Sequence, residues 1–230
     1  LGVEIIHELY CEPTGKFAHN PEPLPEHLSA LASEVKQQKA DLGIAVDPDV
    51  DRLALIDEKG IPFGEEYTLV AVADYILKHK KGNTVSNLSS SKALRDISKK
   101  HGVEYTASAV GEVNVVEKMK VTNAIIGGEG NGGVILPELH YGRDALVGIA
   151  LFLSHLATSN KSTHALRSIY PNYVISKNKI QLEEGMDLKF IIEKIKKYSC
   201  DLFVSMSFNQ IFKSEIINLS LILSLDSPIR

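Results

Sequence analysis

The sequence is poor in the features that mark secreted, membrane-bound and nucleic-acid-binding proteins. Its two cysteines, Cys11 and Cys200, lie far apart and outside any CxxC pattern, so a reducing compartment, the cytoplasm, is expected instead of a disulfide framework. No unbroken apolar run approaches the roughly 20 residues of a membrane span, and no signal-peptide pattern opens the chain. A net charge of −4 and a pI near 6.1 argue against a nucleic-acid or anionic-membrane partner held by bulk electrostatics.

Two familiar metal-binding patterns are also missing. The histidines show neither HxxxH nor HxH spacing, so the sequence gives no sign of zinc. From Asp47 onward the aspartates fall at the first, third and fifth positions of an EF-hand loop, but Arg52 stands where that loop needs glycine. The flanking segments read as strands instead of helices, and an EF-hand is therefore rejected.

What the chain does have is the composition and alternation of an α/β protein. Its 230 residues, 44% hydrophobic and 23% charged, are typical of one or two globular domains. Segments of helical periodicity alternate with short apolar runs from residue 66 onward, which predicts mixed, largely parallel sheets flanked by helices. The predicted helices are 26–39, 66–80, 91–100, 112–120 and 143–157, and the predicted strands are 3–10, 41–46, 52–57, 84–88, 103–107, 123–127 and 134–136. A further partial α+β unit is predicted over 177–199.

Three aspartates crowd into five residues of the stretch ADLGIAVDPDVDRLALID. Asp47, Asp49 and Asp51 lie at every second position, which in an extended loop would aim all three side chains toward one side. Like charges about 4 Å apart repel by roughly 4 kcal/mol near a protein surface, and Mg²⁺ would offset this repulsion. The alternatives are a solvated acidic turn and an aspartate nucleophile, although Asp49 is followed by Val-Asp-Arg and not by a hydroxyl residue. The strand-loop-strand context favours the metal.

A glycine-rich loop, GGEGNGG, follows a predicted buried strand. In it Glu129 offers an acceptor and Asn131 a mixed donor–acceptor side chain, the combination that vicinal sugar hydroxyls need. The alternative is a turn without a ligand. Gly111 opens a predicted helix where backbone N–H groups could meet an anion, or it only makes the turn. Arg143, at the start of another predicted helix, is a candidate phosphate ligand.

In their order along the chain, these motifs resemble those of the α-D-phosphohexomutases, the family of phosphoglucomutase, phosphomannomutase and phosphoglucosamine mutase. DLGIAVDPDVDRLALID is similar to the metal-binding loop of the family, and GGEGNGG to its sugar-binding loop, usually GE-x-S-G. FAHNPEPLPEHL, AVGEVNVV and GRDALVG also resemble family segments. The resemblance implies that the three aspartates bind Mg²⁺, that Arg52 faces a phosphate beside them, and that Glu129 and Asn131 bind sugar hydroxyls.

The resemblance also implies a reaction. Members of the family have four domains, and a phosphoserine in the first exchanges its phosphoryl group with a hexose phosphate through a bisphosphorylated sugar. The chain is then expected to belong to an isomerase that interconverts hexose 1-phosphate and hexose 6-phosphate, with Mg²⁺ neutralising charge on the transferring group. The serine loop, of the T-A-S-H-N-P type, is not found in this sequence. No catalytic residue is therefore expected here, and the 230-residue chain alone is expected to be inactive.

The same resemblance divides the chain into three parts. Residues 1–62 are expected to be the latter part of domain II with the metal loop, 63–160 domain III with the sugar loop, and 161–230 a linker and a partial fourth domain. The expected partners are a hexose phosphate and the remainder of a longer chain. Asn131 stands where serine is common and Gly133 where histidine is common, so the hexose stays open. The alternative is a truncated, non-catalytic module that binds sugar phosphate or metal.

Overall fold

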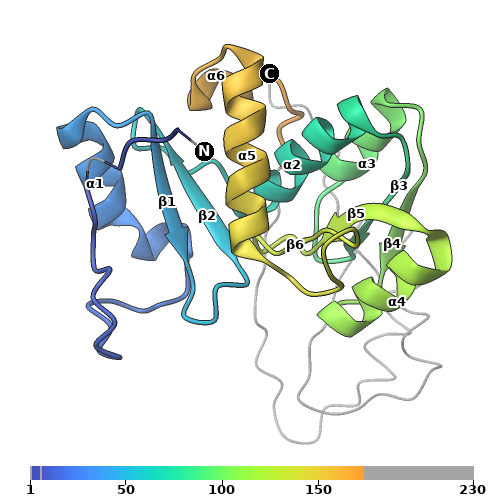
Figure 1. The fold of residues 1–230 in the computed structure, drawn as a ribbon, viewed down its shortest axis with the longest axis horizontal. Coiled ribbons are helices and arrows are strands. Elements are labelled where there is room, and N and C mark those ends of the chain that lie inside the picture. The colour runs from blue at the N-terminus through green and yellow to red at the C-terminus, as the bar shows by residue number, and fades with distance from the viewer. Residues whose placement is uncertain (1, 6, 174–230) are drawn as a thin grey trace, which may run out of the picture. The chain divides into compact units, whose positions relative to one another are not determined.

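A two-stranded hairpin and a four-stranded sheet form the framework of the described residues, which are 2–5 and 7–173 of the computed structural model (Figure 1). The hairpin pairs β1 (Leu42–Val46) with β2 (Leu53–Asp57) in antiparallel register. The sheet has the order β4-β3-β5-β6 and contains β3 (Asn83–Asn87), β4 (Tyr105–Ser108), β5 (Ala124–Gly128) and β6 (Val134–Ile135). Strand β3 is parallel to β4 and β5, and only β6 is antiparallel to its neighbour in this sheet. The predicted α/β class with a mixed, largely parallel sheet is confirmed.

Helices cover both faces of the four-stranded sheet. The helical elements are the 3₁₀ turn η1 (Pro25–His27), α1 (Ser29–Gln38), α2 (Glu65–His79), α3 (Ala93–Lys100), α4 (Glu112–Thr122), α5 (Ala145–Ser159) and α6 (Thr163–Arg167). Helices α2 and α3 lie on one face and α4 on the other, while α5 runs alongside α2 (Figure 1). The predicted unit at 177–199 lies outside the described residues.

Two apolar clusters separate these layers. The larger one joins α2, α3 and α5 to β2 and β5, and in it the rings of Phe63 and Phe152 meet edge to face at 5.0 Å. The smaller one lies under α4, where Val115 and Met119 pack on Val85 and Ile135 of the sheet. Burying apolar side chains on both faces fixes the sheet as a middle layer, so that the ends of its strands become the place for polar loops.

The strand predicted at residues 3–10 is wrong for the part of it that the structure describes. No described strand pairs with it, and its apolar side chains are open to solvent, with Val3 52% and Ile5 73% exposed. An alternating apolar pattern becomes a strand only where a neighbouring strand supplies hydrogen-bond partners and an apolar face to cover.

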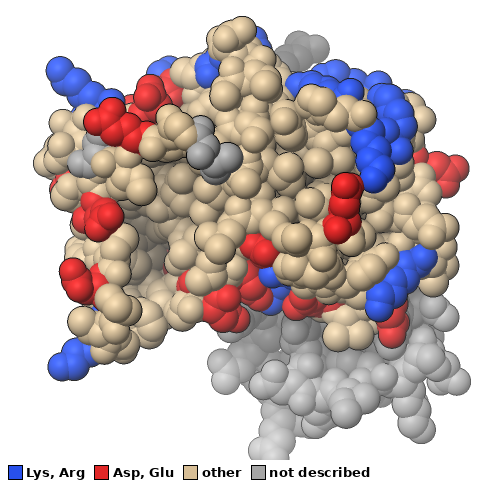
Figure 2. Space-filling view, viewed as in Figure 1, with Lys and Arg blue, Asp and Glu red and all other residues tan. Residues whose placement is uncertain are grey.

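Charged side chains are unevenly spread on the face seen in Figure 2, where Lys and Arg gather over the region of α2 and α3. The last turn of α2 contains Lys78 and His79, and that of α3 contains Lys99 and Lys100. Cations at helix C-termini offset the partial negative charge of the free carbonyl groups, which accounts for this arrangement. None of the helices in the described part of the chain combines the length and apolar character that a membrane span requires.

Candidate metal centre and the neighbouring glycine-rich loop

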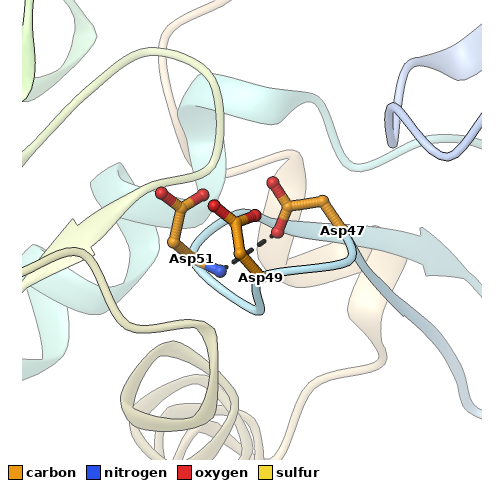
Figure 3. Close-up of side chains that lie close together, drawn as sticks. All are labelled: Asp47, Asp49 and Asp51. Atoms are coloured by element: carbon orange, nitrogen blue, oxygen red, sulfur yellow. Dashed lines mark hydrogen bonds between the residues drawn. The ribbon is translucent and has the colours of Figure 1, made fainter.

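The hairpin loop between β1 and β2, residues 47–52, carries the three aspartates. Asp47 is buried, Asp51 half-buried and Asp49 exposed, and one carboxylate oxygen from each lies within 4.8 Å of the others. Figure 3 shows the three carboxylates side by side along the loop. The structure therefore brings the predicted residues together, while their role as metal ligands stays a prediction.

The backbone brings the aspartates together by a different route from the one expected. The loop is a turn and not extended, with the Val50 N–H donating to the Asp47 carbonyl over 3.0 Å. Val50 has φ 57°, a left-handed conformation that is unusual for a β-branched residue. Backbone strain of this kind is concentrated at functional sites, where the surrounding structure enforces it.

The Asp47 carboxylate holds the loop from inside. Its Oδ1 accepts hydrogen bonds from the backbone N–H groups of Asp51 and Arg52, both at 3.0 Å, and its Oδ2 accepts one from Arg52 Nε at 2.6 Å. Burial works to raise the pKa of Asp47, but the hydrogen bonds from Arg52 and Asp51 outweigh it and leave the pKa below its ordinary value. Asp47 is therefore charged at neutral pH.

Arg52 donates its hydrogen bonds to Asp47 and Glu22, and its Nε also lies 3.7 Å from Asp51 Oδ1. Its NH1 and NH2 groups donate to the two oxygens of Glu22 at 2.6 and 3.2 Å, in addition to the bond from Nε to Asp47. A forked pair of this kind is among the stronger side-chain contacts. Its predicted role beside a phosphate stays a prediction, and in this structure its donors serve two carboxylates.

The two oxygens of Asp51 have different surroundings, and Oδ1 lies 3.7 Å from Arg52 Nε. Its Oδ2 forms an ion pair with Arg143, whereas its Oδ1 is buried and accepts no hydrogen bond from the described part of the chain. Burial raises the pKa of Asp51 to about 6, with Arg143 opposing and the charges of Asp47 and Asp49 adding to the rise. A divalent cation among the three carboxylates would give Oδ1 a partner and remove the repulsion, so the donor set fits Mg²⁺.

The glycine-rich loop lies against this site with its glutamate buried. The Glu129 side chain accepts from Asn87 Nδ2 at 2.7 Å on Oε1, and from Arg143 NH1 at 2.8 Å on Oε2. Asn131 donates to Glu129 Oε2 over 3.4 Å and accepts the Gly133 N–H at 3.2 Å. Two residues predicted to bind sugar hydroxyls are thus neighbours, and their ligand remains a matter of prediction.

Backbone hydrogen bonds join the metal loop and the start of β2 to the glycine-rich loop and to the first residue of α5. Leu53 N–H, where β2 begins, donates to the Gly132 carbonyl at 3.2 Å, and Ala145 N–H donates to the Val50 carbonyl at 3.0 Å. Gly111, with φ 110°, is the residue before α4, and the next residue, Glu112, accepts the backbone N–H of Arg143 at 3.0 Å. The predicted site residues therefore meet in one region, with Gly111 at its edge.

Three residues of this region were not predicted from the sequence. Asn87 ends β3 beside the end of β5, and polar residues at the carboxyl ends of parallel strands are a known signal for ligand sites that could have identified it. Glu112 follows Gly111 in the first turn of a helix, which is a weaker signal. Glu22 precedes Arg52 by 30 residues, and nothing in the local sequence predicts that pair.

Comparison with known proteins gives matches in the same regions. Residues 1–60 match the phosphoglucomutase/phosphomannomutase alpha/beta/alpha domain II, and residues 64–173 match domain III of that family. A phosphoglucomutase/phosphomannomutase from Thermococcus kodakarensis is 36% identical over 197 residues, 85% of this chain and 42% of the relative. A phosphoglucosamine/phosphogalactosamine mutase from Sulfurisphaera tokodaii is 33% identical over 181 residues, 77% of this chain and 40% of the relative. A solved structure from Thermus thermophilus, described as a candidate phosphomannomutase, has a TM-score of 0.62 at 26% identity, covering 66% of this chain and 35% of that chain.

The two domain matches together cover most of the chain, which belongs to the phosphoglucomutase/phosphomannomutase family, the α-D-phosphohexomutases. The resemblance inferred from the motifs is confirmed. The chain spans about two fifths of the length of these curated relatives, 42% of the first and 40% of the second.

Proposed function

We propose that this chain is part of a Mg²⁺-dependent phosphohexomutase that interconverts hexose 1-phosphate and hexose 6-phosphate through a bisphosphorylated sugar. One observation carries the proposal: three carboxylates converge within 4.8 Å beside a glycine-rich loop with a buried glutamate, and one of the three has a buried oxygen that accepts no hydrogen bond from the described residues. Membership of the family supports the reaction class.

In this proposal the residues of the two loops have separate tasks. Asp47, Asp49 and Asp51 hold the cation, which when bound neutralises charge on a transferring phosphoryl group. Glu129 accepts hydrogen bonds from sugar hydroxyls and Asn131 can both donate and accept. The contacts of these residues with one another set where the sugar would lie relative to the three carboxylates.

The remaining residues have roles at the edge of the site. Gly111 leaves backbone N–H groups at the start of α4 open to a phosphate oxygen, and Arg52 lies beside the metal loop. For Arg143, contacts with three carboxylates favour a different role from the predicted phosphate ligand. The nucleophile is assigned to a phosphoserine outside this sequence.

The division of the chain and its location are proposed on sequence grounds. Residues 1–62 would contribute the latter part of domain II, 63–160 domain III, and 161–230 a linker with part of a fourth domain. The cytoplasm is supported by two separated cysteines, and the remainder of a longer chain is the proposed partner besides the hexose phosphate.

Cation binding provides the first test of this proposal. We expect the purified chain to bind Mn²⁺, measured by electron paramagnetic resonance, and to release it on addition of Mg²⁺. Asp49→Asn should weaken binding at least about tenfold, because even partners of metal ligands contribute that much. Asp49 is exposed, so the folded state should survive. Asp41→Asn, an exposed aspartate six residues before the turn, is the matched control and should bind normally.

Sugar binding and turnover provide the second test of the proposed function. Calorimetric titration with the 1-phosphates of glucose, mannose and glucosamine should show one preferred hexose, and Glu129→Gln should weaken its binding. The chain alone should not interconvert the 1- and 6-phosphates. Turnover by the purified chain contradicts a nucleophile outside it, and failure to bind any divalent cation contradicts the metal site.

A further inference from the structure

Arg143 contacts carboxylates from three different elements. Its NH2 group pairs with Asp51 of the metal loop, and its NH1 group donates to Glu129 of the glycine-rich loop at 2.8 Å. Its Nε lies 3.5 Å from Glu112 Oε2 at the start of α4. The side chain is only 18% exposed, so these contacts are poorly screened by water.

The backbone and one glycine fix the path of this side chain. Arg143 N–H donates to Glu112 Oε1 at 3.0 Å, and the N–H of the next residue, Asp144, donates to the Val134 carbonyl at 2.9 Å. A Cβ atom at Gly133 would overlap Arg143 Cδ, so the absence of a side chain there gives the arginine room to pass. The guanidinium group is therefore held in one position between the metal loop and the glycine-rich loop.

The contact with Asp51 leaves that carboxylate in a defined orientation. A carboxylate can rotate about its bond to Cβ unless one of its oxygens is held. Arg143 holds Oδ2, and Oδ1 is left buried and without a hydrogen bond from the described residues. Its nearest cationic group in the described residues is Arg52 Nε at 3.7 Å, too far for a hydrogen bond. An oxygen that accepts no hydrogen bond, next to Asp47 and Asp49, is placed to bind a cation.

The contact with Glu129 fixes a second carboxylate with the same group. Asn87 holds Glu129 Oε1 and Arg143 holds Oε2, so both oxygens are oriented. Guanidinium is planar and presents its N–H donors in a rigid fork, which lets one residue set the spacing of two carboxylates. A phosphate would have to approach Arg143 past these negative charges, which argues against the role of phosphate ligand.

We propose that Arg143 is a positioning residue that links the metal loop to the glycine-rich loop, an inference that rests on the proposed phosphohexomutase function. It turns Asp51 so that Oδ1 faces the cation and, with the same guanidinium, holds Glu129 toward the sugar. Metal affinity then depends on a residue that does not itself touch the metal.

Mn²⁺ affinity of the 230-residue chain tests this inference. Arg143→Met keeps most of the side-chain length but removes the fork, and should weaken Mn²⁺ binding roughly 10- to 100-fold. Arg143→Lys keeps the charge on one flexible ammonium group without the planar fork, so it should recover only part of the loss. Gly133→Ala changes no charge, and by displacing the arginine it should also weaken binding. Arg95→Met, the same change at a half-exposed arginine of α3, is the matched control and should bind normally.

A second readout reports on the other loop. Amide hydrogen exchange over residues 127–133 should be faster in Arg143→Met than in the unaltered chain or in Arg95→Met, because Glu129 loses its hydrogen bond and ion pair with Arg143. Circular dichroism checks that each variant is folded. If Arg143→Met is not folded, the Mn²⁺ affinities of Arg143→Lys and Gly133→Ala test the positioning role instead.

The outcomes separate this inference from the function on which it rests. Unchanged Mn²⁺ affinity in folded Arg143→Met, or in both Arg143→Lys and Gly133→Ala, overturns the positioning role while leaving the metal site in place. Complete recovery by lysine also overturns it, since charge alone would then suffice. No Mn²⁺ binding by the unaltered chain contradicts the metal site and the inference together.

Discussion

At the scale of single residues, two aspartates of one loop meet opposite environments. Hydrogen bonds from Arg52 and Asp51 outweigh burial and lower the pKa of Asp47, whereas burial and nearby negative charge raise that of Asp51 to about 6 despite Arg143. Asp47 is thus held by the protein itself, and Asp51 is the carboxylate that gains most from a cation. Two carboxylates that look equivalent in the sequence therefore have different surroundings in the fold.

Replacing Asn87 removes a hydrogen bond that orients the Glu129 carboxylate without changing any charge. Asn87 donates to Glu129 and accepts the Ser90 hydroxyl at 2.9 Å, and it is buried. Asn87→Ala should lower the free energy of unfolding by about 1–3 kcal/mol, because both partners lose a buried hydrogen bond. It should also weaken hexose-phosphate binding, measured by calorimetric titration. Asn114→Ala, at an exposed asparagine of α4, should change neither quantity appreciably.

At the scale of elements, the hairpin loop stores strain. Val50 holds a left-handed conformation, which costs an ordinary residue roughly 1–2 kcal/mol, and the turn around it carries the aspartates. The hydrogen bonds of Asp47 and the bond from Ala145 N–H to the Val50 carbonyl hold the turn closed. The hairpin and α5 thus support a shape that the loop would not adopt alone.

Replacing Val50 tests that strain. Val50→Gly should raise the free energy of unfolding by about 0.5–1 kcal/mol, since relief of the left-handed conformation exceeds the entropy cost of glycine. Val113→Gly, at an exposed position in α4, should have the opposite sign and lower it by about 0.5 kcal/mol. Urea denaturation measures both. A destabilised Val50→Gly would show that the loop is not strained.

Helix α5 begins at a side-chain cap that also supports the site. Asp144 Oδ1 accepts the Val147 N–H at 2.9 Å, directly after Arg143 in the chain. Asp144→Ala should lower the free energy of unfolding by about 1 kcal/mol, and Asp144→Asn by much less, because asparagine caps helices as well as aspartate does. Urea denaturation measures both variants. If both lose the same free energy of unfolding, the charge of Asp144 and not its role as a helix cap is responsible.

At the scale of the whole described unit, a buried polar network ties the helices together. The Asp74 carboxylate in α2 accepts from His101 Nε2 at 2.7 Å and from Tyr170 OH at 3.3 Å, and Lys78 Nζ lies 3.0 Å away. His155 of α5 lies 2.9 Å from the Tyr170 hydroxyl. Four segments are thus joined by one carboxylate that no solvent reaches.

This network makes stability depend on pH in a known direction. Burial works to raise the pKa of Asp74, but hydrogen bonds from His155, His101 and Lys78 outweigh it and hold the pKa well below its ordinary 3.8. A carboxyl group with a depressed pKa in the folded state stabilises above its unfolded value and loses that contribution as pH falls. The stabilisation should be complete above about pH 4 and decline in more acidic solution.

Asp74→Asn is the corresponding experiment. At pH 7 it should lower the free energy of unfolding by about 2–3 kcal/mol, the contribution of hydrogen bonds to a charged group. Urea denaturation of both proteins between pH 7 and pH 3 should show this difference constant at first and smaller below about pH 4. A difference that grows with acid would contradict the network as described.

Much of the fold and of the site was predictable from local pattern. Apolar residues at the helical period of 3.6 predicted α2, α4 and α5, and short apolar runs predicted the strands of the four-stranded sheet. These predictions were possible because each element buries a face that its own sequence defines. The DPDVD and GGEGNGG motifs indicated the two loops, because closely spaced aspartates and clustered glycines are unusual within regular helices and strands. Segment 3–10 misled because a strand depends on a partner that its own residues do not specify.

The sequence by itself determined the family, the layers and the chemical groups available, because periodicity, turn residues and carboxylate spacing are local properties. Only the tertiary structure decided which groups meet. Arg143 lies 92 positions after Asp51 in the chain, and Glu22 lies 30 before Arg52. Such pairs form when packing brings distant segments together, so the orientation of each carboxylate is a property of the folded molecule.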